Sequence, residues 1–235
     1  MNAYRYRAAA QALPAPFLHS TVLDAIRPPI ALPLFTAFVL GPQRGEQSRK
    51  RYELGKRCLD IILALAVLLL SSPFLIILPL LIRWSSPGRS IFRQERVGQN
   101  GEVFTMYKFR TMHASAPGYG YSPTGSQDPR LTRIGRLLRR TSLDELPQLI
   151  NVLAGKMSLV GPRPEMPFIV QDYTDEQRQR LSVKPGMTGL WQISPHRLLP
   201  IHEHLEYDFY YLRHRSFRLD AAILLQTLLV AGRGV

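Results

Sequence analysis

One uncharged stretch, from Ile61 to Ile82, limits the folds open to this chain more than any other feature. It reads IILALAVLLLSSPFLIILPLLI and is about 22 residues long, which is enough for an α-helix that enters or crosses a bilayer. A helix that is apolar on every face would need a much larger soluble domain around it. The stretch is not a signal peptide, because it begins about sixty residues into the chain. We therefore predict that it inserts into a membrane.

The middle and the flanks of this stretch indicate a bent helix that returns to the side it entered from. Pro73 follows Ser71 and Ser72; proline kinks a helix, and serine hydroxyls can bind the carbonyls that the break frees. Basic residues precede the stretch at 49–57, and an excess of Lys and Arg marks the cytoplasmic side of a membrane. Four arginines follow it: Arg83, Arg89, Arg93 and Arg96. We expect a re-entrant helix with both ends on the cytoplasmic side, and an ordinary kinked span is the alternative.

The charge balance limits the partners. The 235 residues include 30 Lys and Arg against 17 Asp and Glu, a formal net charge of +13. Such an excess suits an anionic partner, which is nucleic acid, anionic lipid or a phosphorylated substrate. The membrane stretch and the lack of a recognisable binding module argue against nucleic acid. The single cysteine, Cys58, rules out an intramolecular disulfide and fits a reducing, cytoplasmic exposure.

The rest of the chain predicts a small α+β domain that is mainly helical. Residues 91–112 alternate around the turn GQNG and predict a β-hairpin. Residues 131–142 combine one apolar face with several arginines, which is typical of an amphipathic helix at a phospholipid surface. A helix over 142–155 would begin with a capping box formed by Ser142 and Glu145, and two more helices follow near the C-terminus. The chain then divides into an extension of unknown role (1–48), a basic flank with the membrane helix (49–90) and a cytoplasmic domain of amphipathic helices and the hairpin (91–235).

Two adjacent acids, Asp144 and Glu145, stand out in a basic chain. Acids in the first turn of a helix are ordinary, because they satisfy end donors and complement the helix dipole. The nearby cations favour a functional role instead. Arg163 lies between two prolines in VGPRPE, and guanidinium groups bind phosphates in a bidentate manner. Two more cations, Arg139 and Arg140, shortly precede the acids, and the stretch YKFRTM adds Lys108 and Arg110.

A carboxylate among phosphate-binding cations has two chemical uses. It can attack phosphorus and form an acyl phosphate, or it can hold a Mg²⁺ ion that bridges phosphate oxygens. Neighbouring side chains on a helix point about 100° apart, so Asp144 and Glu145 can each serve one use. The sequence contains no Walker-type glycine loop and no GxGxxG motif, so neither usual nucleotide-binding fold is indicated.

Four stretches together resemble the bacterial sugar transferases, that is, the monotopic phosphoglycosyl transferases. They are KRCLDIILALAVLLLSSPFLIILPLLIR, FRQERVGQNGEVFTMYKFRTM, LRRTSLDELPQLINVLAGKMSLVGPRPE and KPGMTGLWQI, and the match covers about residues 49–233. The resemblance implies transfer of a sugar 1-phosphate from a UDP-sugar to undecaprenyl phosphate, with release of UMP, by a ping-pong route. This step would begin exopolysaccharide, O-antigen or related glycan assembly at the cytoplasmic face of the bacterial inner membrane. Ser72 and Pro73 match the break that makes the family's helix re-entrant.

The resemblance also implies roles for individual residues. Asp144 would be the nucleophile that carries the phospho-sugar, and Glu145 would hold Mg²⁺, the expected cofactor. Arg139 and Arg163 fall at the family's basic positions and would bind phosphates. Beyond the resemblance, we predict four further phosphate- or substrate-binding residues: Lys108, Arg110, Arg140 and Lys184.

The segment after TGLWQ departs from the family. Many members have a Ser-Gly-Arg type stretch there, whereas this chain has ISPHRLLP (193–200), which leaves the local turn and the identity of the sugar open. A non-catalytic scaffold on the same fold is an alternative, although both acids are present. A metal site at His202, Glu203 and His204 is another; side chains at i and i+2 do not share a helix face, so we predict surface residues. Self-association into a homo-oligomer also stays open.

Overall fold

The computed structural model describes residues 46–117, 127–197 and 199–231, so the predicted N-terminal extension lies almost entirely outside it. The described chain is mainly helical with small sheets, which confirms the α+β class. The elements in chain order are α3 (Glu46–Leu70), α4 (Ser72–Ser85), β1 (Ile91–Val97), η1 (Gln99–Gly101), β2 (Val103–Phe109), α5 (Arg133–Arg140), η2 (Leu143–Glu145), α6 (Gln148–Leu153), β3 (Ser158–Val160), α7 (Pro167–Gln171), α8 (Asp175–Arg178), η3 (Gln179–Ser182), β4 (Gly186–Thr188), α9 (Leu190–Ile193), η4 (Ile201–Glu203), α10 (Glu206–His214) and α11 (Phe217–Ala231).

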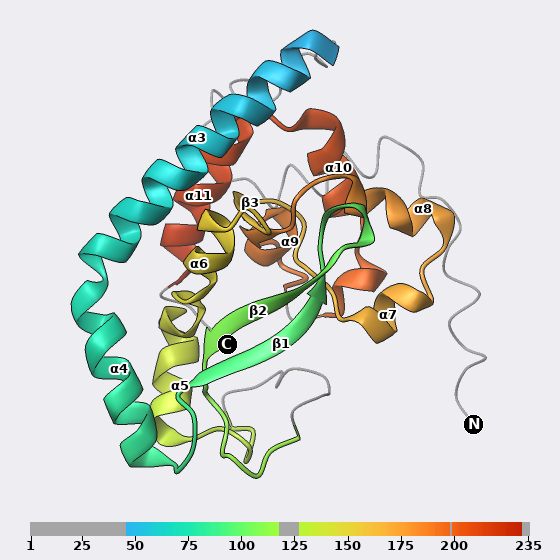
Figure 1. The fold of residues 1–235 in the computed structure, drawn as a ribbon. Helices are drawn as coiled ribbons and strands as arrows, with labels where there is room; N and C mark the ends of the chain where they lie inside the picture. The colour runs from blue at the N-terminus through green and yellow to red at the C-terminus, as the bar shows by residue number, and fades with distance from the viewer. Residues whose placement is uncertain (1–45, 118–126, 198, 232–235) are drawn as a thin grey trace, which may run out of the picture.

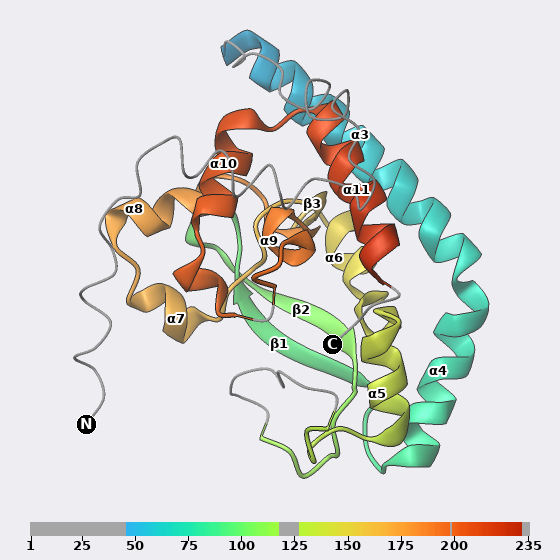
Figure 2. The same ribbon diagram turned by 180° about the vertical axis from the view of Figure 1, so that it is seen from behind.

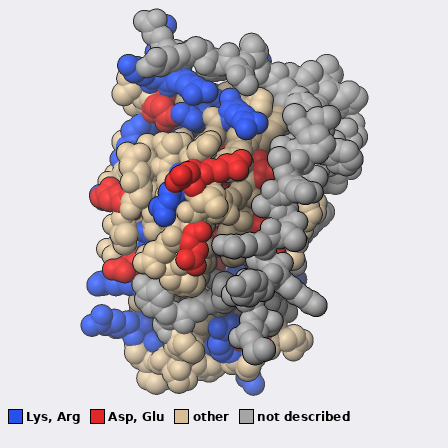
Figure 3. Space-filling view, turned by 90° about the vertical axis from the view of Figure 1, so that its right-hand side faces the viewer, with Lys and Arg blue, Asp and Glu red and all other residues tan. Residues whose placement is uncertain are grey.

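The two N-terminal helices run along one side of the molecule. Figures 1 and 2 show α3 and α4 as a long bent rod, with α11 beside α3 and with α5 and α6 between the rod and the β1–β2 hairpin. Helices α7, α8 and α10 lie on the side away from the rod. The surface on that side carries both acidic and basic side chains (Figure 3).

The break between α3 and α4 falls where the sequence predicts it. Pro73 lies in the first turn of α4, and the two helices are bent by 61°. The Ser71 hydroxyl donates to the Val67 carbonyl at 2.6 Å, and the Ser71 N–H donates to the same carbonyl at 2.8 Å, so the serine bonds back onto the last turn of α3. No single helix in the described part of the chain is long and apolar enough to cross a membrane, whereas the bent pair passes that test by length and composition. A broken span and a re-entrant loop both fit this geometry.

One face of the bent pair belongs to the interior of the domain. Ala64 of α3 is fully buried in the main hydrophobic cluster, which also contains residues of α6, α10 and α11. Leu78 of α4 belongs to a second cluster with residues of β2 and α5. Tyr52 and Lys56 bind the Asp220 carboxylate of α11 at 2.7 and 2.8 Å. The rod is therefore fixed to the domain by packing and by buried polar contacts, and its opposite face is left exposed.

The hairpin predicted for residues 91–112 is confirmed. Strands β1 and β2 pair antiparallel over their whole length. Asn100 and Gly101 form the turn with φ of 56° and 82°, a backbone conformation that asparagine and glycine adopt most readily. Strands β3 and β4 form a second, parallel pair that was not predicted. These strands have only three residues each and show no alternation that a sequence pattern could reveal.

The helix predicted over 131–142 is confirmed as α5, whereas the chain from 142 to 155 folds differently from the prediction. Helix α5 is capped by Thr132, whose hydroxyl accepts a hydrogen bond from the Gly135 N–H at 2.8 Å. The capping box predicted at Ser142 and Glu145 is wrong, because Ser142 has a left-handed backbone and its side chain makes no capping bond. Pro147 gives the physical reason, since a helix begun at 142 would press the proline ring against an earlier carbonyl. The chain instead makes the η2 turn and begins α6 after Pro147.

Candidate active site

The two adjacent acids lie in η2, where α5 and the end of β2 meet. Asp144 is buried, with 7% of its surface exposed, and Glu145 is part-buried. Helix α5 can approach the chain after β2 because residue 135 is glycine; a Cβ there would lie 1.8 Å from the Thr111 carbonyl oxygen. This close approach brings the last turn of α5, with Arg139, to the acids.

Three cations surround the acid pair. Lys108 Nζ lies 2.7 Å from Glu145 Oε1, and Arg163 Nη2 lies 3.4 Å from the same oxygen. Arg139 is half-buried and electrostatically favours the ionised form of Asp144. These cations come from β2, from α5 and from the turn after β3, so the site forms only when three distant segments pack together.

The environment moves the pKa values of the two acids in opposite directions. Burial is the largest influence on Asp144 and raises its pKa to about 6, against the opposing effect of Lys108. Burial also acts on Glu145, but Lys108 and Arg163 outweigh it and lower the pKa of that carboxyl to about 2. Neighbouring groups with pKa values pushed apart are typical of catalytic pairs whose members have different roles.

The other predicted binding residues lie elsewhere. Arg110 donates to the carbonyls of Pro87, at 2.9 Å, and Ser86, which fastens the end of α4 to the hairpin. Arg140 is exposed on the last turn of α5. The charged groups that act on Lys184 belong to α3. The structure therefore gathers Lys108, Arg139 and Arg163 around the acids and gives Arg110 a contact with the α4 end.

The turn from Pro162 to Glu165, which presents Arg163, has all four of its carbonyls hydrogen-bonded. The donors are the Gly186 N–H to Pro162 at 2.8 Å, Arg180 Nη2 to Arg163 at 2.8 Å, Arg96 Nη1 to Pro164 at 3.1 Å and the Val97 N–H to Glu165 at 2.9 Å. The two prolines also restrict φ on either side of Arg163. The guanidinium thus extends from a backbone that is fixed at four successive residues.

Arg180 is the buried centre of this support, and sequence reasoning missed it. Its side chain is 1% exposed and binds the Asp208 carboxylate of α10 at 2.7 Å. The Tyr173 hydroxyl accepts a second bond at 2.7 Å, and the Arg163 carbonyl accepts a third. A buried guanidinium needs such partners because its charge and donors have lost water. Asp208 follows 28 residues later, so no local pattern reveals the pair.

Asn151 ties α6, the helix that follows the acid turn, to β2, and it too was missed. Its amide Nδ2 donates to the Thr105 carbonyl at 2.7 Å, and its Oδ1 accepts the Tyr107 N–H at 3.1 Å. The side chain therefore acts as a strand partner along β2. Because Lys108 directly follows Tyr107, the contact also sets the position of that lysine relative to α6. An asparagine within a helix is a weak sequence signal for such a role, because it is a poor helix former.

The prediction that His202, Glu203 and His204 are surface residues holds only for the glutamate. Both histidines are part-buried. His202 Nδ1 lies 3.7 Å from an oxygen of Glu165, and this contact raises the pKa of His202. His202, two residues after the segment that departs from the family (193–200), therefore touches the Pro162–Glu165 turn.

Comparison with known proteins agrees with the motifs. The chain matches the family model for bacterial sugar transferases over residues 51–234. The UDP-glucose:undecaprenyl-phosphate glucose-1-phosphate transferase of Escherichia coli K12 is 42% identical over 74% of this chain and 39% of that protein. The exopolysaccharide production protein PSS of Rhizobium leguminosarum is 39% identical over 76% of this chain and 97% of that protein. The undecaprenyl-phosphate galactose phosphotransferase of Salmonella typhimurium is 37% identical over 76% and 40%.

The chain therefore belongs to the bacterial sugar transferase family, as its motifs predict. The match spans about two fifths of the length of the Escherichia and Salmonella relatives and nearly all of the Rhizobium one.

Proposed function

We propose that this protein transfers a sugar 1-phosphate from a UDP-sugar to undecaprenyl phosphate, releases UMP and so begins the assembly of an exopolysaccharide or O-antigen type glycan. The observation that carries the proposal is a buried acid pair, Asp144 and Glu145, set among Lys108, Arg139 and Arg163 with the two acid pKa values moved apart. Such a site offers one nucleophilic carboxylate and one fixed anion beside groups that bind phosphate. The names of the Escherichia and Salmonella relatives support the donor and acceptor classes.

Asp144 is the proposed nucleophile. Its ionised carboxylate forms a bond to the sugar-bearing phosphorus, while the bond from that phosphorus to the bridging oxygen breaks and its electron pair leaves on UMP. The sugar phosphate is then held on Asp144 as an acyl phosphate. A phosphate oxygen of undecaprenyl phosphate next attacks the same phosphorus and releases Asp144 as a carboxylate. A pKa of about 6 leaves Asp144 mostly ionised at neutral pH and makes its oxygens more basic than those of an exposed aspartate.

The three cations are proposed to bind the donor's diphosphate. Glu145 holds Lys108 and Arg163 close together before substrate arrives, because both contact its Oε1. Arg163 cannot move far, since its own backbone is fixed through the Pro162–Glu165 turn. Pre-positioned donors of this kind stabilise negative charge as it moves toward the leaving phosphate.

Glu145 is the proposed ligand for Mg²⁺. In phosphoryl-transfer sites this ion is usually held by one or two carboxylates together with substrate phosphates. The acid pair fits that requirement: in the described part of the chain, both cation contacts of Glu145 fall on Oε1, which leaves Oε2 for an ion. The lowered pKa of Glu145 keeps that oxygen anionic. The ion would supply further positive charge to the donor's phosphates.

We also propose that α3 and α4 form a re-entrant helix in the cytoplasmic face of the bacterial inner membrane. The face of the pair that turns away from the domain is apolar, with Leu70 and Trp84 exposed over 80% and 86% of their surfaces. Large exposed apolar surfaces mark membrane or protein contacts. Basic residues at both ends favour a return to the same side. Other exposed apolar residues of the pair are Ile62, Leu65, Leu69, Phe74, Ile76 and Leu80.

Cysteine labelling tests the re-entrant arrangement. In a Cys58→Ser background, Arg49→Cys and Arg89→Cys each place one exposed thiol beyond an end of the apolar stretch. An impermeant maleimide should label neither in intact spheroplasts and both in inside-out vesicles, because both ends face the cytoplasm. Labelling of one end from the outside would establish a full span instead. A periplasmic cysteine on a separate membrane protein serves as the positive control.

The activity itself is tested by UMP release from the purified full-length protein in nanodiscs. We expect release with at least one member of a panel of UDP-sugars, and only when undecaprenyl phosphate and Mg²⁺ are both present. Omission of undecaprenyl phosphate, or its replacement by farnesol, should return the signal to background. Omission of Mg²⁺, or addition of EDTA, should do the same. No release with any UDP-sugar would contradict the proposal and favour a non-catalytic scaffold on the same fold.

A further inference from the structure

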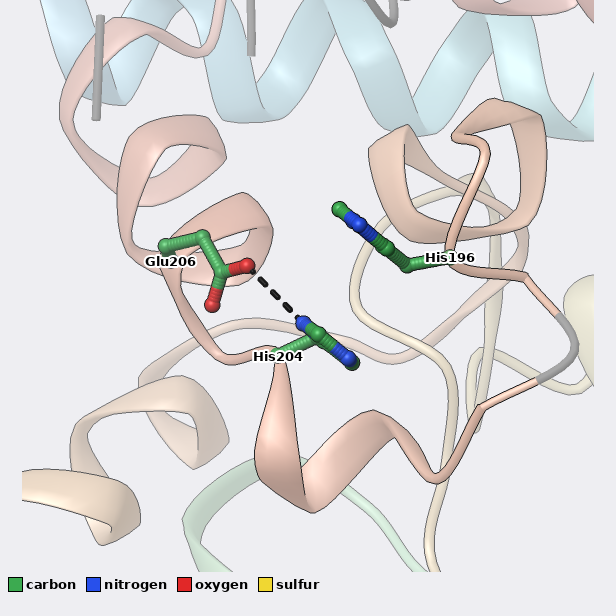
Figure 4. A group of neighbouring side chains, drawn as sticks. All are labelled: His196, His204 and Glu206. Atoms are coloured by element: carbon green, nitrogen blue, oxygen red, sulfur yellow. Dashed lines mark hydrogen bonds and ion pairs between the residues drawn. The ribbon is translucent and has the colours of Figure 1, made fainter. Parts of the chain in front are cut away.

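A second group of ligand-type side chains lies outside the proposed active site, in and just after the segment that departs from the family. His196 follows α9, His204 follows η4, and Glu206 is the first residue of α10. Ligand atoms of these three residues all lie within 4.8 Å of one another (Figure 4). Across the described ranges, no other three His, Cys, Asp or Glu side chains were found so placed.

The donor set selects a class of ion. Two imidazoles and one carboxylate suit zinc and similar first-row transition ions. Mg²⁺ and Ca²⁺ prefer oxygen ligands, so this group differs in chemistry from the Mg²⁺ site proposed at Glu145. The group therefore points to a separate ion.

A neighbouring side chain orients one of the histidines. The hydroxyl of Tyr207, which is fully buried, lies 2.8 Å from Nδ1 of His196. Metal-binding histidines commonly engage their second ring nitrogen in such a bond, which fixes the ring and leaves the other nitrogen for the ion. That bond leaves Nε2 of His196 as the ring nitrogen available to an ion. His204 Nδ1 lies 3.1 Å from Glu206 Oε1, and an ion would replace the proton that these two atoms share.

The two imidazole rings need one rotation to bind a common ion. They are stacked with their planes 2° apart and their centroids 4.5 Å apart. Because an ion lies in the plane of each ring that binds it, one ring must turn out of the stack. Ligand atoms around tetrahedral zinc are roughly 3.3 Å apart, given bonds of about 2.0 Å, so the atoms of this group must draw together from within 4.8 Å to that spacing. Both histidines are part-buried rather than tightly enclosed, which leaves room for the turn.

We propose that His196, His204 and Glu206 form a binding site for a divalent transition-metal ion of the zinc class, completed by water. Three protein ligands leave one tetrahedral position open for that water. The ion joins the loop after α9 to the start of α10. It therefore holds together the two ends of the chain between His196 and His204, which includes most of the segment that differs from the family. His202, which lies between this segment and the ligand His204, contacts Glu165, and the ion therefore stiffens one side of the turn that presents Arg163.

Cobalt titration of this chain in detergent tests the site, because Co²⁺ in a tetrahedral site absorbs visible light much more strongly than aqueous Co²⁺ does. The protein is first stripped with EDTA and then kept in excess Mg²⁺. We expect one equivalent of Co²⁺ to bind and to be displaced by Zn²⁺. His196→Asn, His204→Asn and Glu206→Gln should each weaken binding by about a hundredfold or more. His214→Asn, on the same helix α10, is the matched control and should bind as the wild type does.

Thermal denaturation gives a second readout. Zn²⁺ at a hundred times its Kd should raise the wild-type midpoint by about 5 °C or more and leave that of His204→Asn unchanged. If one ligand variant fails to fold, the other two decide. The proposal is overturned if the wild type binds no stoichiometric Co²⁺, if the ligand variants bind it normally, or if binding is lost in Glu145→Gln instead.

Discussion

The Asp144→Asn variant is expected to lose sugar-phosphate transfer by about 10³-fold or more and to melt at a higher temperature than the wild type. Activity falls because an amide cannot form the acyl phosphate. Stability rises because the fold no longer buries a carboxylate whose pKa it raises from 3.8 to about 6. A pKa shift of this size corresponds to a difference of about 1–3 kcal/mol in the free energy of unfolding at neutral pH. UMP release and thermal denaturation on one preparation measure both effects.

The stability that Asp144→Asn gains over the wild type should increase as the pH rises. A buried acid with a raised pKa destabilises the folded state only while it is ionised, so the penalty is complete above about pH 6 and absent below 3.8, the value of the unfolded chain. The difference in melting temperature between wild type and Asp144→Asn should therefore be largest near pH 8 and vanish near pH 4. A variant that melts below the wild type at neutral pH would contradict this account, and substantial residual turnover would exclude Asp144 as the nucleophile.

The Glu145→Gln variant, one residue away, is the matched control. We expect it to change the stability of the fold in the opposite direction. Although burial opposes its ionisation, Lys108 and Arg163 lower the pKa of Glu145 from 4.5 to about 2. Its charge therefore stabilises the fold above pH 4.5, and this contribution is lost as the pH falls through about 2. The variant leaves the two cations without their partner, so we expect it to melt below the wild type at neutral pH. A general effect of removing negative charge would shift both variants the same way.

The Arg180→Met variant is expected to lose about 3–5 kcal/mol of stability, because it leaves the Asp208 carboxylate buried and unpaired. It also removes the donor to the Arg163 carbonyl, so transfer by any folded fraction should fall as well. Chemical denaturation in detergent measures the first effect and UMP release the second. Arg178→Met, two residues earlier and exposed, should change neither.

The double variant Arg180→Met with Asp208→Leu separates the two roles of this arginine. Replacing a buried ion pair by apolar groups is often neutral, so most of the lost stability should return. Transfer should stay impaired, because the Arg163 carbonyl still lacks its donor. Full recovery of both properties would reduce Arg180 to a structural role, and a loss below about 1 kcal/mol in the single variant would contradict the buried-pair account.

Local patterns predicted the features that depend on neighbouring residues. The helix break at Ser71 to Pro73 and the hairpin turn at Asn100 follow from the backbone preferences of proline and of turn residues. The acid pair was found because it breaks the charge pattern of a basic chain. The capping box failed although Pro147, which excludes a helix begun at Ser142, stood in the same stretch.

The supports of the site could not be predicted in this way. Arg180 and Asp208 meet across 28 residues, and Asn151 reaches a strand that precedes it by more than 40 residues. An isolated arginine or asparagine in a sequence gives no sign of which carbonyl it binds, because that depends on how the helices pack. The same reasoning applies to His196 and His204, whose shared position becomes visible only in the folded chain.

The support of the Pro162–Glu165 turn also sets an order of events during synthesis. The turn depends on β1, η3 and the start of β4, and its central donor Arg180 depends on Asp208 in α10. Ribosomes release the N-terminal part first, so the apolar stretch and both acids emerge well before Asp208. A nascent chain can therefore present both acids while Arg163 is still unfixed. Under the proposed function, competence for transfer is acquired only after α10 has been made, so a nascent chain that ends before Asp208 should not yet react with the acceptor.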